Sequence, residues 1–89
     1  MRFRIAIRHE RKNIRLNVER VLKSNELERF EVTARNKALT IQSNRPLLIA
    51  KGLKNKKPDY KLIAGTMQNI YILNEIISAI HQYMKQFPE

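Results

Sequence analysis

Apolar side chains recur at every second residue near the start of the chain, and this spacing limits what the chain can fold into. The pattern covers residues 2–8 and 13–19, where the apolar positions are Phe3, Ile5, Ile7, Ile14, Leu16 and Val18. A period of two is typical of strands with one buried face. If Ile7 lies opposite Ile14, one hairpin register puts all six side chains on the same face. Residues 9–12 contain no glycine, so we expect a four-residue loop rather than a tight primed turn.

The same alternation returns at residues 29–35 and 38–43 and predicts a second hairpin. A two-residue turn over residues 36–37 would place Ala34 opposite Leu39, with the apolar side chains of both strands again on one face. The turn would begin with asparagine, which tolerates positive φ better than most residues.

Two further segments are predicted to be strands. Residues 47–51 continue an apolar run after Pro46, which is typical of a strand covered on both faces, so we expect it near the middle of the sheet. Residues 59–64 resume the alternation after a lysine-rich loop, and Gly65 ends the strand. The sequence thus predicts five or six antiparallel strands.

The C-terminal segment 67–87 is expected to form one long amphipathic helix. At 100° per residue, its apolar side chains fall in one half of the helical wheel and its polar side chains in the other, with Tyr71 as the exception. Thr66 or Asn69 could cap the N-terminus, and Pro88 limits continuation of the helix. We therefore predict an α+β fold: an antiparallel sheet of five or six strands packed on one face by a single long C-terminal helix.

The size and composition set the class of protein. The 89 residues leave room for a single domain, residues 1–89, and the absence of cysteine excludes disulfides and thiolate metal sites. No apolar run approaches the roughly 18 residues needed to cross a bilayer, and the charged start is unlike a signal peptide. We expect a cytoplasmic protein with no membrane partner.

The sequence contains no recognisable catalytic constellation. Asp59, the only aspartate, lies among lysines, and the three glutamates in residues 26–31 are interpreted as solvated surface charge. His9 and His81 lack the spacing of metal ligands, and the two glycines are too isolated to form a phosphate-binding loop. We therefore expect a protein that is not an enzyme, with no metal and no cofactor, and we identify no small-molecule substrate.

The charge distribution suggests a polyanion partner. Of the 18 lysines and arginines, 17 lie in residues 1–61, and the formal net charge is +10. The alternation that would build the core leaves arginines on the far face of the sheet, where planar guanidinium groups suit phosphates. The predicted nucleic-acid-binding residues are Arg2, Arg4, Arg8, Arg15, Lys54, Lys56 and Lys57. That face carries no clear aromatic residue, so binding would be backbone-led and poor in sequence preference. A solvated face without a ligand is an equal alternative.

A protein-interaction module, acting as a homodimer or adaptor, is the alternative function. The apolar half of the helix is wider than the roughly 100° stripe that a helix usually buries, so part of it could meet another chain. The predicted interface residues are Ile70, Tyr71, Leu73 and Ile77. A helix that sinks deeply into a concave sheet would explain the same width.

A resemblance covers residues 27–65. It is carried by the segments Phe30-Glu31-Val32-Thr33-Ala34, Asn36-Lys37, Gln42-Ser43-Asn44-Arg45-Pro46 and Lys51-Gly52-Leu53-Lys54. In these segments the chain resembles a group of short uncharacterised bacterial proteins. No activity is attached to that group, so the resemblance implies no functional residues. It implies a stand-alone small protein of unknown function rather than a fragment of an enzyme.

Overall fold

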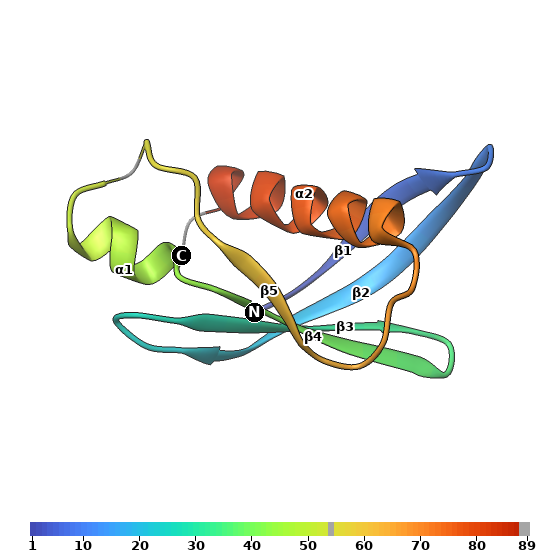
Figure 1. Cartoon of the computed structure of the whole chain (residues 1–89), viewed down its shortest axis with the longest axis horizontal. Helices are drawn as coiled ribbons and strands as arrows, with labels where there is room; N and C mark the ends of the chain where they lie inside the picture. The colour runs from blue at the N-terminus through green and yellow to red at the C-terminus, as the bar shows by residue number, and fades with distance from the viewer. Residues whose placement is uncertain (54, 88–89) are drawn as a thin grey trace.

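The computed structural model describes residues 1–53 and 55–87, and these fold into a five-stranded antiparallel sheet and two helices (Figure 1). The elements are β1 (Arg2–His9), β2 (Lys12–Lys23), β3 (Glu28–Ala34), β4 (Lys37–Ser43), α1 (Arg45–Ala50), β5 (Tyr60–Ala64) and α2 (Ile70–Gln86). Strand order in the sheet follows chain order, so β1 and β5 are the edges. The predicted α+β class is confirmed, with the long helix α2 lying across one face of the sheet (Figure 1).

The β1–β2 hairpin has the register that the alternation predicts, with Ile7 opposite Ile14 and Ile5 opposite Leu16. Its turn is shorter than predicted. Glu10 and Arg11 form a two-residue connection with φ of 50° and 64°. The expectation of a four-residue loop was wrong, because two residues other than glycine adopt the left-handed conformation that a primed turn requires.

The β3–β4 hairpin is present, but its register differs from the predicted one. Ala34 lies opposite Lys37 rather than Leu39, and the turn residues are Arg35, at φ 52°, and Asn36. The pairing is therefore shifted by two residues. Because side chains alternate with a period of two, this shift leaves every side chain of β4 on the face that the sequence predicts.

Helix α1 replaces the strand predicted over residues 47–51, and that prediction was wrong. A short apolar run cannot be assigned to strand or helix by periodicity alone. Pro46 stands in the first turn of the helix, where its missing N–H would have no intrahelical partner in any case. The sheet therefore has five strands within the described residues, and its middle strand is β3.

Helix α1 ends in a Schellman motif around Gly52, whose φ of 73° is left-handed. The N–H of Gly52 donates to the carbonyl of Ile49 at 3.0 Å, and the N–H of Leu53 donates to the carbonyl of Leu48 at 2.7 Å. In this motif the residue after the glycine commonly contacts the residue that accepts its hydrogen bond. The turn therefore directs the chain back so that Leu53 returns beside Leu48.

Helix α2 begins at Ile70, slightly later than predicted, because Asn69 caps it. The Asn69 side-chain oxygen accepts hydrogen bonds from the N–H groups of Tyr71 at 2.9 Å and Ile72 at 3.3 Å. Asn69 has an extended backbone and thus has the conformation typical of an N-cap residue.

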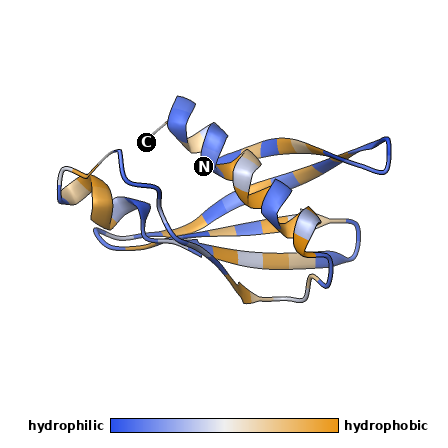
Figure 2. Cartoon of the chain, turned by 45° about the horizontal axis from the view of Figure 1, so that its top comes forward, coloured by the Kyte–Doolittle hydropathy of each residue, from blue (hydrophilic) through white to orange (hydrophobic). Residues whose placement is uncertain are grey.

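The hydrophobic core lies between α2 and the sheet. Its buried side chains are Phe3, Ile5, Ile7, Leu16, Val18, Phe30, Val32, Leu39, Ile41, Ile76, Ile80 and Met84. The ring of Phe3 stacks on Tyr83 with 3.7 Å between centroids, which joins β1 to the C-terminal half of α2. In Figure 2 hydrophobic and hydrophilic bands alternate along the strands, as half-buried strands require.

Candidate nucleic-acid interface

The sheet face opposite α2 is here called the open face. Its side chains come from alternate positions of all five strands and are exposed or half-exposed. They belong to Arg2, Arg4, Ala6, Arg8, Asn13, Arg15, Asn17, Glu19, Arg29, Glu31, Thr33, Ala38, Thr40, Gln42 and Lys61. These described positions include six basic side chains, two carboxylates and no aromatic ring.

The four predicted arginines of β1 and β2 all lie on the open face. Arg4 and Arg8 are on β1, and Arg15 of β2 pairs with Ala6, the residue midway between them. Diagonal neighbours in an antiparallel pair have Cα atoms about 7–8 Å apart, within reach of long side chains. No carboxylate among residues 1–53 and 55–87 forms an ion pair with Arg4, Arg8 or Arg15. The hairpin therefore displays three adjacent guanidinium groups that have no carboxylate partner in the described part of the chain.

Arg2 differs from these three arginines because it is paired. Its Nε donates to Oε2 of Glu19 at 2.8 Å, and this hydrogen bond and the charge of Glu19 raise the pKa of Arg2. Both side chains are solvent-exposed, and exposed ion pairs are weak. Arg29 is also engaged, since its Nε donates to Oε1 of Gln42 at 2.9 Å.

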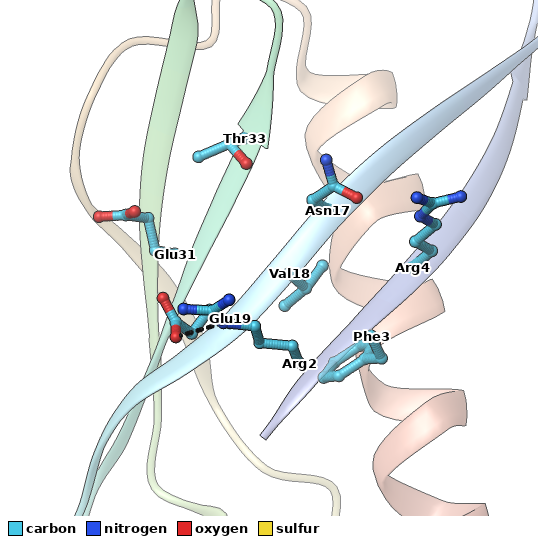
Figure 3. Close-up of a pocket in the computed structure, with 8 residues that line it drawn as sticks. All are labelled: Arg2, Phe3, Arg4, Asn17, Val18, Glu19, Glu31 and Thr33. Carbon is cyan, nitrogen blue, oxygen red and sulfur yellow. Dashed lines mark hydrogen bonds and ion pairs between the residues drawn. The ribbon is translucent and has the colours of Figure 1, made fainter.

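A hollow of about 460 Å³ opens on this face where β1, β2 and β3 meet (Figure 3). Its lining residues are Arg2, Phe3, Arg4, Asn17, Val18, Glu19, Glu31 and Thr33. Glu19 and Glu31 lie opposite each other on neighbouring strands. Glu31 repels an anion at this end of the hollow, where Arg2 offsets the charge of Glu19, and the opposite end, lined by Arg4 and Asn17, is more favourable to an anion.

The predicted loop lysines Lys56 and Lys57 do not lie on the open face. Lys54 is outside the described residues. Lys56 lines a pocket together with His81 and Lys85 of α2, and the charge of Lys57 also acts on His81. The chain leaves β4 through α1 on the side of the sheet that α2 covers (Figure 1). The structure thus separates Lys56 and Lys57 from the open-face arginines.

The hairpin turns add cations that are not among the predicted nucleic-acid-binding residues. Arg11 and Lys12 are exposed at the β1–β2 turn, and Arg35 and Lys37 are exposed at the β3–β4 turn. Because the strands are antiparallel and consecutive, both turns lie at the same end of the sheet (Figure 1). These cations could have been predicted from the sequence if the two turns had been placed at residues 10–11 and 35–36.

A buried charged cluster holds the other end of the sheet together. Glu28 is 0 % exposed, and its carboxylate accepts hydrogen bonds from Arg45 Nε at 2.7 Å and Arg45 Nη2 at 2.8 Å. Ser43 Oγ donates to the same carboxylate at 3.3 Å, and Arg20 Nη1 lies 3.7 Å from it. The interpretation of Glu28 as solvated surface charge was therefore wrong. Its bidentate pair with Arg45 joins β3 to α1.

The buried polar groups near this cluster are partnered. The hydroxyl of Tyr60 lies 3.1 Å from Nδ1 of His81, and burial raises the pKa of Tyr60 to about 12. Burial lowers the pKa of His81, and the charges of Lys85, Lys57 and Arg45 lower it further. Within the described residues every buried side-chain nitrogen or oxygen has a hydrogen-bond partner. This network has the character of a structural anchor.

The described residues contain no group of three or more histidine, aspartate or glutamate side chains placed to hold a metal ion. Neither α1 nor α2 is long and apolar enough to cross a membrane. The chain is thus an α+β protein with a basic open face. No family model, curated protein or solved structure gives a significant match to it. The resemblance of residues 27–65 to short uncharacterised bacterial proteins stays a prediction.

Proposed function

We propose that this protein binds the phosphate backbone of nucleic acid through the open face. One observation carries the proposal: Arg4, Arg8 and Arg15 are adjacent on an uncovered sheet surface and have no carboxylate partner among the described residues. Lysines and arginines that neutralise phosphates release condensed counterions, and this release supplies most of the affinity of non-specific binding. Arg11 adds an exposed cation at the turn of the same hairpin.

The composition of the open face supports backbone contacts rather than base recognition. Proteins that read single strands on a sheet stack bases on exposed aromatic rings, and the described open-face positions carry none. Glu19 and Glu31 restrict the favourable surface to the β1–β2 hairpin. We therefore expect weak discrimination between sequences and a strong dependence of affinity on salt.

The test compares two variants that carry the same charge. One replaces the three open-face arginines with glutamine (R4Q/R8Q/R15Q), and the other replaces three lysines beyond β4 (K51Q/K56Q/K57Q). Each lowers the formal net charge from +10 to +7. Fluorescence anisotropy with labelled single-stranded DNA, single-stranded RNA and duplex DNA measures affinity at about 50 mM and 200 mM salt.

The arginine variant should bind more weakly at both salt concentrations. Its slope of log affinity against log salt should fall by about 2–3, since each phosphate contact contributes about 0.7–0.9. The lysine variant should keep most of the salt dependence that the unmodified protein shows. An equal loss in both variants would mean that net charge alone matters, and no binding at the lower salt concentration would remove the proposal.

A protein-interaction role is the second candidate, and the start of α2 supports it. Ile70 is 56 % exposed and Tyr71 is 76 % exposed, whereas Leu73 and Ile77 pack against the core. Only the first two predicted interface residues are therefore free to meet another chain. Sedimentation velocity over a range of protein concentrations tests this role: association through Ile70 and Tyr71 should persist in high salt and be lost in Y71K.

A further inference from the structure

A second hollow, of about 410 Å³, lies between α1, the loop that follows it and the C-terminal half of α2. Five of its lining residues are apolar: Leu48, Ile49, Leu53, Pro58 and Met84. The other four are basic: Arg45, Lys56, His81 and Lys85. No carboxylate lines it within the described part of the chain. This hollow is here called the α1–α2 pocket.

The apolar part of the pocket is built by the end of α1. The Schellman turn returns Leu53 beside Leu48, whose own side chain is buried. Leu53 nevertheless remains 44 % exposed, and Ile49 is exposed beside it. Met84 of α2 is a buried core side chain that lines the inner wall of the pocket. The pocket therefore exposes apolar side-chain carbon atoms to water, and a bound ligand would cover them.

The charged side chains that line the pocket in the described residues are all basic. Lys56 and Lys85 are exposed and both line the pocket, Lys56 from the loop and Lys85 from α2. Arg45 is different, since its guanidinium is already held by Glu28. The lowered pKa of His81 reflects burial first and then the nearby positive charges. Two rim ammonium groups are thus available to an incoming anion.

We propose that the α1–α2 pocket binds a small amphiphilic anion, a medium-chain carboxylate, with its chain against Leu48, Leu53 and Met84 and its head group between Lys56 and Lys85. The volume of the pocket, about 410 Å³, lies in the usual range of ligand sites. An alkyl chain of about eight carbons is of the right order for such a pocket. Each buried methylene should raise affinity about fourfold. The proposal is independent of nucleic-acid binding by the open face.

The experiment uses octanoate as the probe and observes the full chain by NMR. Octanol tests the alkyl chain without a charge, and octylammonium tests the same alkyl chain with the opposite charge. Acetate tests the carboxylate without a long alkyl chain. The ring protons of His81 report on the head group, with His9 in the β1–β2 hairpin as an internal control. Octanoate should bind at least about tenfold more tightly than octanol, as one added charge-assisted contact predicts. Acetate and octylammonium should not bind detectably.

Octanoate should also raise the pKa of His81, and the ring-proton signals of His9 serve as the control for non-specific effects. The groups that face His81 are the hydroxyl of Tyr60 and the cations Lys57, Lys85 and Arg45. A bound carboxylate offsets these cations and so favours the protonated ring. Octanol should produce no such rise.

Two variants locate the ligand. L53E places a carboxylate at the exposed rim and should weaken octanoate binding by at least about tenfold, while I63E on β5 is the control at a similarly exposed apolar position. K85Q should weaken octanoate binding and leave octanol binding unchanged. The open-face variant R4Q/R8Q/R15Q should bind octanoate normally, which separates the two proposals. Equal affinity for octanoate and octanol, equal effects of L53E and I63E, or no binding of octanoate would each overturn the proposal.

Discussion

Replacing Glu28 with glutamine should destabilise the fold strongly. Glutamine has nearly the same shape as glutamate but no charge. Its amide N–H₂ is a donor and cannot accept a hydrogen bond from the guanidinium groups around it, which are donors only. Arg45, which is buried, and Arg20, whose side chain is 13 % exposed, then lose their shared counterion. Breaking a buried ion pair from one side costs about 3–5 kcal/mol. A chain of 89 residues is stable by only about 4–13 kcal/mol, so this loss is a large part of the total.

Urea denaturation followed by circular dichroism measures this effect. With a slope of about 1–1.5 kcal/mol per molar urea, the midpoint should fall by roughly 2–5 M, or the variant should be unfolded without urea. E26Q is the matched control, because Glu26 is exposed on the loop before β3 and its loss should change stability by less than about 0.5 kcal/mol.

The double variant E28Q/R45Q completes a mutant cycle for the same pair. If the two side chains act together, its loss should be smaller than the sum of the two single losses by at least about 1 kcal/mol. A loss below about 1 kcal/mol in E28Q, or strictly additive single losses, would show that the carboxylate does not hold α1 to the sheet.

Three further results are expected. G65A should cost at least about 2 kcal/mol in urea denaturation, because φ is 86° and the new Cβ would lie 2.5 Å from the carbonyl oxygen of Ala38. G52A, at φ 73° with open space around it, should cost only about 1 kcal/mol; equal losses would contradict the steric argument. The ultraviolet titration of the native protein should contain a phenolate transition near pH 12 that Y60F removes. Because the unfolded chain releases this proton near its ordinary pKa of 10, the contribution of Tyr60 to stability should be lost as pH rises from 10 to 12. N69A should cost about 0.5–2 kcal/mol through loss of the α2 cap, and an unchanged urea midpoint would rule out that role.

The faces of the sheet could be predicted because they depend on a local property. Alternation along a strand decides which side chains share a face, whatever the exact pairing. The β3–β4 register was predicted two residues away from the observed one, yet Val32 and Leu39 are buried as expected. The amphipathic wheel of α2 likewise indicated its buried face, on which Ile76 and Ile80 lie.

The buried ion pair and the α1–α2 pocket could not be predicted in this way. The segment that becomes α1 is too short for its periodicity to distinguish a helix from a strand. Glu28 and Arg45 are 17 residues apart, so their pairing depends on how β3 and α1 meet. The position of Lys56 beside Lys85 depends in turn on that helix and the loop after it.

The sequence by itself determined which side chains leave the core, and so placed Arg4, Arg8 and Arg15 on an exposed sheet face, because side-chain direction is a property of each strand alone. Tertiary structure decided which of the exposed cations are near one another. The hairpin arginines lie on the open face, whereas Lys56 lines the α1–α2 pocket. This separation depends on tertiary structure, because contacts between distant segments depend on how the elements pack.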